Sequence, residues 1–538
     1  MTAFKLIHIL AVGSAAILLS ACGGGDGDSG GAGGGGVSPP GATAPPTSGA
    51  YNWVLKAEGP TSQLKFGLSL VHPTTPGTEW VIEAPNAAVT DAKVVASGTV
   101  DASTQTVSAL RPFALVYIVG GDVRRVPLQA NGSAPKPQAQ SSQTSSVCGF
   151  VLDAVDHGAP EMSRFIVATA GADGQCNTAD DGAAEVRLSN TAPGISVTPI
   201  SGARPLAVLR DPSTLAPRGW VAATQASFWA PGPGQTVNLR PTANPLLRVV
   251  AGTYRTVLAE AASGLSVFDF SGGTSFTESA VAGVGTTGWQ PIGHDAQYFY
   301  AYRNSGNETG TWQVLRVLRA GGGASVLGGG NGAVSVASLG RDYVYVTVLG
   351  VNNNQLARMN KLVPSTTAQI LETTPRSTLT TVVTSANDVH QRWRVTGVGT
   401  ANPAYVLEFF DEAGATLFSS TGGGFPLLLA GGNSLNFNAS ENRSIFVVAD
   451  RYGARAFGNA SVVVMDTQAR TARTMGALPG TSEFGADFVF ASASGGPGSA
   501  MAGFAGRSVN GVVQGAGARV FSFDAATASS LKYTSQQQ

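Results

Sequence analysis

From about Ser163 to the C-terminus, short apolar runs and polar turns recur in a fixed order. Each unit starts with an apolar run, which is followed by a gap that contains Gly or Asn. An alternating run comes next, and the unit ends in a turn and a run with a weaker apolar pattern. The clearest unit reads SIFVVAD (444–450), then SVVVMDT (461–467), then TARTMGALPG ending at Gly480. Alternation with a period of two residues places apolar side chains on one face of a strand, so the pattern predicts small antiparallel sheets.

The units recur at a spacing typical of propeller blades. Their first strands can be marked at Phe165, Leu206, Val257, Tyr298, Tyr343, Trp393, Phe446 and Phe504. The marks lie about 40–60 residues apart, and a repeat near this length with three or four strands characterises blades. The body resembles bacterial β-propellers, which implies an all-β fold of about eight blades over residues 148–536; seven or nine blades also fit. The alternative is a row of tandem β-sandwiches, whose polar linkers should recur about every 100 residues.

Residues 51–130 also read as strands, beginning with YNWVLKAEG at Tyr51. They predict either one or two further blades or a separate β-rich region before the propeller. Residues 131–147 are rich in Pro, Gln and Ser, which predicts a polar surface loop or linker.

The first 22 residues read as a targeting segment rather than as part of the fold. Lys5 precedes an apolar stretch from Leu6 to Leu19, too short for a transmembrane helix and suited to a signal-peptide core. The stretch ends in Leu19-Ser20-Ala21-Cys22, which resembles the lipobox of bacterial lipoprotein precursors. That resemblance implies removal of residues 1–21 and lipidation of Cys22; the alternative is an ordinary secretory signal with a chance cysteine.

The residues after Cys22 predict where the anchored protein resides. Gly23 stands where an Asp would resemble the inner-membrane retention signal, so we expect an extracytoplasmic protein on the outer membrane. Residues 22–50 are rich in Gly and Pro and have few apolar side chains, so they predict a flexible tether. The membrane is then the first expected partner, contacted through acyl chains.

Charge narrows the class of partner. The 538 residues include 33 Lys plus Arg and 33 Asp plus Glu, so no basic field is present to attract nucleic acid. Only 12% of residues are charged, while 70 are Gly, a balance that suits strands joined by tight turns.

Three cysteines occur, and Cys22 is assigned to lipid. Cys148 and Cys176 are then the only pair left in an oxidising compartment, which predicts a disulfide between them. Two free thiols or a redox pair are the alternatives, although no Cys-x-x-Cys spacing supports the latter.

The stretch AGADGQCNTADDG (170–182) surrounds Cys176 with carboxylates. It resembles aspartate loops of bacterial extracellular proteins, some of which bind calcium. By that resemblance Asp173, Asn177, Asp180 and Asp181 are candidate calcium ligands, since calcium takes several oxygen ligands. The loop departs from the EF-hand pattern, and the alternative is a hairpin tip stabilised by its own Asp and Asn side chains.

No catalytic residues are predicted. Gly-x-Ser-x-Gly occurs only at residues 27–31, within the Gly-rich predicted tether, where no strand or helix is expected to form a nucleophile elbow, and no Gly-Lys dipeptide provides a P-loop. Gly283 to Gly288 matches Gly-x-Gly-x-x-Gly, but no helix follows, so we interpret it as a turn between blades. His294-Asp295 is an adjacent His–carboxylate pair, as is Asp156-His157, and we interpret His294-Asp295 as the edge of a strand. Five tryptophans in or beside strands are expected in blade cores, with a binding face as the alternative: Trp220, Trp229, Trp289, Trp312 and Trp393.

These features favour a lipid-anchored envelope protein that acts as a binding or scaffold module toward an envelope protein or glycan. The alternative is an envelope enzyme acting on polysaccharide or peptide at the mouth of the propeller channel. A third hypothesis is a structural coat lipoprotein without a specific ligand. The same location is expected for all three.

Overall fold

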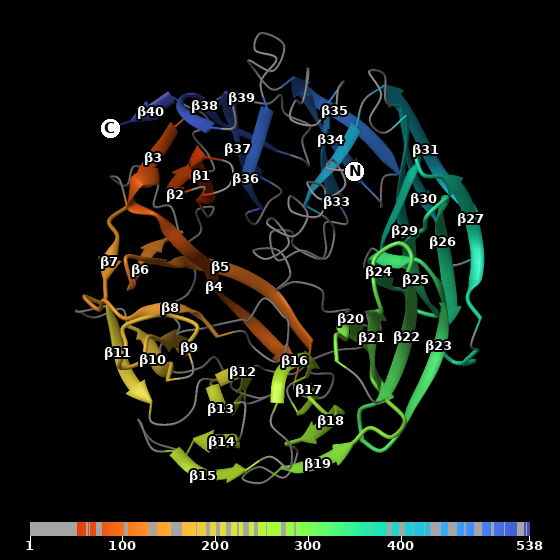
Figure 1. Ribbon diagram of the computed structural model, residues 1–538. Helices are drawn as coiled ribbons and strands as arrows, with labels where there is room; N and C mark the ends of the chain where they lie inside the picture. Colours follow the sequence, from red (N-terminus) through yellow and green to blue (C-terminus); the bar gives the residue numbers. More distant parts are fainter. Residues whose placement is uncertain are drawn as a thin grey trace.

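The computed structural model describes residues 51–537 apart from loops, the longest being 129–136, 152–163, 431–442, 450–459 and 478–486. Within this part the protein is all-β: forty strands form nine sheets, joined by one 3₁₀ turn, η1 (Pro85–Ala87), and no α-helix is described. The expectation of an all-β protein is therefore confirmed. Figure 1 shows the sheets following one another around the centre of the molecule.

Eight of the sheets have four strands each, in sequence order or its reverse. The first three are β4(Val89–Asp101), β5(Thr106–Val119), β6(Asp122–Pro127), β7(Gln140–Ser141); β8(Val147–Phe150), β9(Arg164–Thr169), β10(Gly182–Leu188), β11(Ile195–Ile200); and β12(Pro205–Arg210), β13(Pro217–Ala222), β14(Gln225–Trp229), β15(Thr236–Pro241).

The next three sheets contain the central part of the chain. They are β16(Leu246–Gly252), β17(Thr256–Ala261), β18(Gly264–Asp269), β19(Thr277–Ala280); β20(Gln290–His294), β21(Tyr298–Asn304), β22(Thr311–Leu318), β23(Ala324–Asn331); and β24(Ala333–Leu339), β25(Tyr343–Leu349), β26(Asn353–Asn360), β27(Gln369–Pro375).

Two more four-stranded sheets complete the series. They are β28(Leu379–Thr384), β29(His390–Thr396), β30(Ala404–Phe410), β31(Thr416–Gly423); and β32(Phe425–Ala430), β33(Arg443–Ala449), β34(Ala460–Asp466), β35(Thr471–Ala477).

The ninth sheet joins the two ends of the described chain. It contains β1(Asn52–Pro60), β2(Lys65–Val71), β3(Thr78–Glu83), β36(Asp487–Gly495), β37(Ala500–Val509), β38(Val512–Asp524), β39(Lys532–Tyr533) and β40(Ser535–Gln537). Strand β38 pairs with β1, and β40 runs parallel to β3. The first strands of the 51–130 region therefore share a sheet with the C-terminal strands, and its later strands β4–β6 belong to the first four-stranded sheet.

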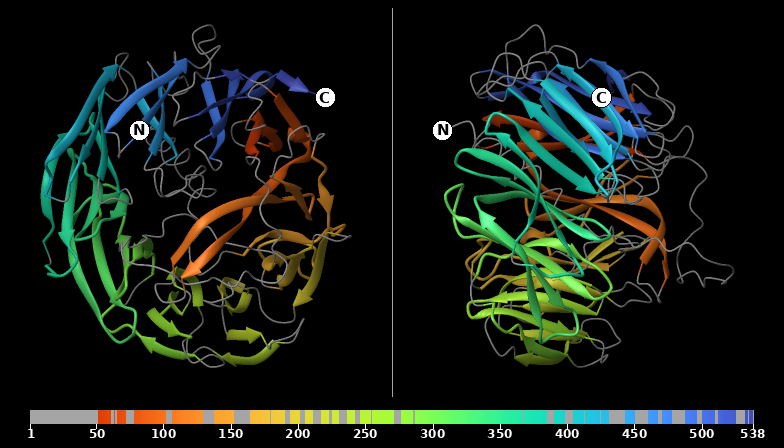
Figure 2. Two further views of the ribbon diagram at one scale, coloured as in Figure 1. Left: turned by 180° about the vertical axis from the view of Figure 1, so that it is seen from behind. Right: turned by 90° about the vertical axis from the view of Figure 1, so that its right-hand side faces the viewer.

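Successive sheets contact each other mainly through their first strands. Contacts run from β12 to β16, from β16 to β20, from β20 to β24 and from β24 to β28. In Figures 1 and 2 the first strand of these sheets lies toward the centre, and the fourth strand lies at the periphery. The predicted loop 131–147 also contains a strand, since β7 pairs with β6.

Position within a sheet determines the pattern of burial. The second strands are buried almost continuously, as in β17, where all six residues are buried. The third strands β22 and β26 alternate with an identical burial pattern, and the fourth strand β27 is mostly exposed. A strand buried on both faces needs continuous apolar sequence, whereas an outer strand does not, which explains why the weaker run that ends a unit forms the outer, fourth strand of its sheet.

Candidate functional site

A pocket of about 210 Å³ lies between the sheet β16–β19 and the sheet β20–β23. The turn after β19 and the residue before β20 form one wall, and the facing surface of β21–β23 forms the other. Its lining residues are Ala282, Gly283, Val284, Trp289, Arg303, Gln313, Leu315, Ala324 and Val326.

The pocket begins where the apolar face of one sheet becomes polar. On β21, Phe299 and Ala301 are fully buried in the core between the two sheets, together with Leu315 on β22. The next residue of β21 on this face is Arg303, which pairs in register with Gln313. Two polar side chains thus replace the apolar ones at the end of the shared core.

Small residues keep the space open. Gly283 has φ +76°, in the left-handed region that favours glycine, and a Cβ added there would meet no atom within 4 Å. Ala282 and Gly283 are exposed, so the pocket is open to solvent on this side. Neither of these residues nor Ala324 has a side chain long enough to fill it.

The wall formed by Trp289 is held by an ion pair between the buried Glu260 and the partly exposed Arg248. Glu260, which is 3% exposed, accepts hydrogen bonds from the backbone N–H groups of Gly288 and Trp289, both at 2.9 Å. Arg248 pairs with the Glu260 carboxylate at 3.2 Å and also donates to the Trp289 carbonyl oxygen. Both backbone groups of Trp289 are therefore held by side chains of the preceding sheet.

Trp289 in turn positions Arg303. The guanidinium carbon of Arg303 lies 5.1 Å from the centre of the Trp289 ring, a cation–π contact. Within the described part of the chain, neither Arg303 nor Gln313 forms a side-chain hydrogen bond or ion pair. Both side chains are partly exposed, and the described residues that line the pocket include no Asp, Glu, His, Ser or Cys.

The Asp295 carboxylate is held within a turn by several contacts. Asp295 follows β20 in this turn, where its carboxylate accepts hydrogen bonds from the N–H groups of Gln297 and Tyr298 at 2.9 Å and from the Tyr300 hydroxyl at 2.5 Å. Lys361 of the next sheet pairs with it at 3.1 Å. Burial by itself would raise the pKa of Asp295, but these hydrogen bonds and the Lys361 charge together lower it, whereas burial and Asp295 raise the pKa of Tyr300.

A second cation repeats this contact one sheet earlier. Arg319 follows β22 as Lys361 follows β26, and it donates to the Asp295 carbonyl at 2.6 Å and to the Thr253 hydroxyl of the preceding sheet at 3.3 Å. Thr253 and Asp295 begin equivalent turns, each closed by a hydrogen bond to the residue three positions later. Arg319 and Lys361 therefore link neighbouring sheets at equivalent places in two successive repeats.

The predicted disulfide is present. Cys148 on β8 bonds to Cys176 in the loop between β9 and β10, with the two Cα atoms 5.5 Å apart. The bridge joins the start of one sheet to the loop that carries the aspartates, as expected.

The aspartate loop is a network of internal hydrogen bonds. Asp180 and Asp181 accept bonds from the N–H groups of Asp173 and Asn177, respectively, and the Thr178 hydroxyl lies 2.8 Å from Asp180 Oδ1 and 3.1 Å from Asp181 Oδ1. Among the described residues no three His, Cys, Asp or Glu side chains are grouped to hold a metal ion. Calcium binding by Asp173, Asn177, Asp180 and Asp181 stays a prediction.

Two further sequence predictions concern the membrane and the tryptophans. Cys22, the predicted lipidation site, lies outside the described residues, as do the signal peptide and tether. In the part of the chain that is described, no helix is long and apolar enough to cross a membrane. Trp289 and Trp312 are buried as expected, while the side chains of Trp220, Trp229 and Trp393 are not described.

One sequence motif lies beside the pocket: the stretch from Gly283 to Gly288, which the sequence analysis interpreted only as a turn between blades. The described residues at its two ends lie between β19 and β20, as predicted, and Gly283 and Val284 line the pocket. Nothing in its composition indicated which residues it would face.

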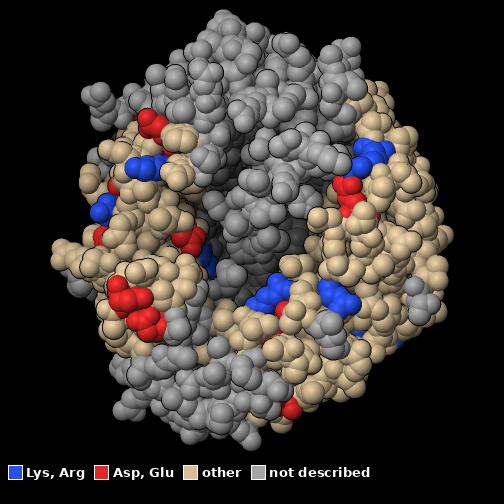
Figure 3. Space-filling model, in the orientation of Figure 1, with Lys and Arg blue, Asp and Glu red and all other residues tan. Residues whose placement is uncertain are grey.

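Figure 3 shows the face of the molecule that is turned to the viewer in Figure 1, and this face is hollowed near its centre. Lys and Arg side chains gather at the edge of the hollow, with Asp and Glu side chains beside them. The mixture of both signs agrees with the balanced composition and shows no extended basic surface on the described part of this face.

Comparison with family models and with curated protein sequences gives no match. Among solved structures, an oligogalacturonate lyase in complex with manganese aligns with TM-score 0.33 and 10% identity, covering 71% of this chain and 84% of the lyase. A mutant of a puromycin hydrolase aligns with TM-score 0.32 and 13% identity, covering 73% of this chain and 54% of the hydrolase. A putative TolB from Agrobacterium tumefaciens aligns with TM-score 0.24 and 11% identity over 42% of this chain and 77% of that one. At these scores the similarities carry no argument about function.

Proposed function

We propose that this protein is a lipid-anchored β-propeller outside the cytoplasmic membrane, held on the outer membrane, and that it acts by binding a ligand rather than by catalysis. The succession of four-stranded sheets around a centre supports the propeller assignment. The lipobox ending in Cys22 and the residue Gly23 support the anchor and its membrane. The envelope partner is a protein or a glycan.

The pocket beside Trp289 is the observation that carries the binding function. Its walls are apolar and small, and two polar side chains without partners among the described residues face into it. Pockets with a few oriented polar groups on an apolar lining are typical of ligand sites. Catalysis there would require an acid, base or nucleophile, and the lining has none of the usual ones.

Labelling with palmitate tests the anchor. We expect incorporation into the full chain and none into Cys22→Ser, because the thioether forms only on that sulfur. Equal labelling of both proteins, or of neither, would show that the anchor is wrong.

Reversible cross-linking in intact cells, followed by purification of the adducts, tests the binding function. We expect one envelope protein in stoichiometric amount, or retention of the protein on isolated envelope glycan. Release of shortened or modified glycan or peptide by the purified protein would instead establish the enzymatic alternative.

A further inference from the structure

We infer that the pocket between β19 and β23 binds a small organic carboxylate with a short apolar chain, held by Arg303 and Gln313. This inference deepens the proposed binding function and rests on it. It does not depend on the lipid anchor, because every residue that it uses lies in the described body.

The charge of the ligand follows from Arg303. The guanidinium is always protonated and presents its N–H groups in one plane, which suits the two oxygens of a carboxylate. The guanidinium carbon lies 5.1 Å from the centre of the Trp289 ring, and Arg303 is partly exposed. Since no carboxylate of the described chain contacts Arg303, an anionic ligand would provide the pairing that the protein does not.

The rest of the lining argues against a phosphate. Phosphate sites offer several backbone N–H groups or several cations, because the anion has more oxygens and more charge. Here one cation and one neutral amide, that of Gln313, lie beside the apolar side chains of Val284, Leu315 and Val326. One carboxylate oxygen could accept from Gln313 while an alkyl chain packs against the apolar wall.

The volume limits the size of the ligand. Pockets for drug-sized molecules usually measure about 300–1,000 Å³, and this one measures about 210 Å³. A branched chain of four or five carbons suits the space. The carboxylate could belong to a free acid or to the carboxyl end of a peptide.

Side chains of the preceding sheet, β16–β19, order the site before a ligand binds. Glu260 and Arg248 fix the backbone of Trp289 from both sides, so the ring that Arg303 contacts is in place before a ligand arrives. A site that is already ordered loses less conformational entropy on binding. Glu260 is therefore a positioning residue of this pocket.

Isothermal titration of the full chain, purified in detergent, tests the inference with isovalerate and with isovaleramide, its neutral isostere. We expect isovalerate to bind at least tenfold more tightly than the amide. N-acetyl-leucine tests whether the carboxyl end of a peptide is preferred to a free acid, and inorganic phosphate tests the other anion class.

Variants identify the site. Arg303→Gln should weaken isovalerate binding at least tenfold, and Arg303→Lys should weaken it as well because the planar fork is lost. Arg255→Gln removes the same charge from an exposed position and should leave binding unchanged. Ala324→Leu should block the pocket from another strand, so the site remains testable even if Arg303→Gln does not fold.

Equal affinity for isovalerate and its amide, tight binding of phosphate alone, or unchanged binding by both Arg303→Gln and Ala324→Leu would overturn the inference. None of these results would alter the outcome of palmitate labelling or of cross-linking. Failure of the ligand assignment is therefore distinguishable from failure of the proposed function.

Discussion

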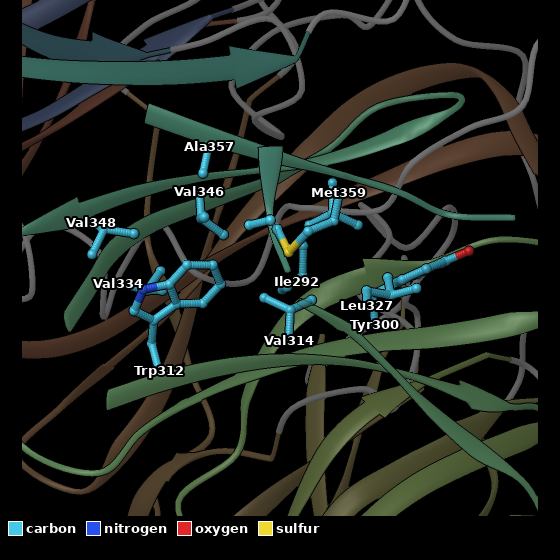
Figure 4. Packing of buried hydrophobic residues seen from close by; sticks show 12 residues of the cluster. Ile292, Tyr300, Trp312, Val314, Leu327, Val334, Val346, Val348, Ala357 and Met359 are labelled. Carbon is cyan, nitrogen blue, oxygen red and sulfur yellow. The ribbon is translucent and has the colours of Figure 1, made fainter. Parts of the chain in front are cut away.

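The two faces of the sheet β20–β23 meet their neighbours in different ways. Toward β24–β27 the face is filled: Trp312 and Met359 lie among aliphatic side chains from both sheets, with Val314, Val346 and others between them (Figure 4). Toward β16–β19 the face begins with an equally apolar core around Phe299 but ends in the pocket beside Arg303. One sheet thus has a closed interface on one side and an open one on the other.

The glycines show how this difference arises. Gly328 lies on the filled side, where an added Cβ would stand 2.7 Å from Met359 Cγ, so the space left by the glycine is occupied. Gly283 lies on the open side, where an added Cβ would meet nothing within 4 Å. A missing side chain leaves a cavity only where no large neighbour fills it, because packed interiors tolerate few empty spaces. The space beside Gly283 is therefore the one of the two that a ligand could occupy.

Removing the buried carboxylate of the open interface should have the largest effect. Glu260→Ala leaves Arg248 without its partner and leaves two backbone N–H groups unsatisfied, so we expect a loss of about 3 kcal/mol in the free energy of unfolding. Urea denaturation measures it. Glu58→Ala, at an exposed Glu, is the control and should change stability by less than about 0.5 kcal/mol. Equal effects would show that the open interface does not depend on this ion pair.

Enlarging a residue on the filled interface should come next. Gly328→Ala places a methyl group against Met359 and Ala368, and overpacking of this kind costs about 2 kcal/mol. Gly323→Ala in the preceding turn adds the same methyl group where nothing lies within 4 Å. If the two variants melt at the same temperature in calorimetry, the interface is not closed as described.

The ion pair of the filled interface should contribute less and depend on pH. Asp295→Asn should cost about 1 kcal/mol at neutral pH, since the Asp295–Lys361 pair is partly exposed. The pKa of Asp295 is lowered in the folded state, so its contribution is full above the unfolded pKa and is lost as pH falls through the lower, folded value. The difference between wild type and Asp295→Asn should therefore shrink below about pH 4 in urea titrations. A constant difference down to about pH 2 would contradict the assignment.

Filling the pocket should have the smallest effect and the opposite sign. Ala324→Val adds apolar volume to an open space and should raise the free energy of unfolding by about 0.5 kcal/mol. Ala301→Val makes the same change in the closed part of the same face, where Ala301 is fully buried, and should destabilise. Destabilisation of similar size by both variants would mean that the pocket is not open.

Much of the sheet succession could be predicted from the spacing of apolar runs. The eight marks from Phe165 to Phe504 fall in eight successive units, seven of them on the second strand and Leu206 on the first strand of its sheet. Second strands were found most readily because burial on both faces requires continuous apolar sequence. The disulfide could also be predicted, because only two cysteines remained once Cys22 was assigned to lipid.

The joined sheet and the pocket could not be predicted in this way. The pairing of β1 with β38 joins residues from opposite ends of the chain, and no local pattern specifies such a partner. Likewise, Arg303 and Gln313 look like ordinary polar positions on alternating strands. They become a candidate site only because Gly283 and Trp289 of the neighbouring segment face them.

By itself the sequence determined the strands and their approximate boundaries, because the alternation of side chains along a strand is a local property. It also determined the cysteine pair, because only two cysteines were available to bond. The tertiary structure decided which strands share a sheet, which face of β20–β23 is filled and which side chains remain available to a ligand. Those outcomes depend on how surfaces distant in sequence fit together. An empty volume such as this pocket belongs to no single segment, so only the packed structure contains it.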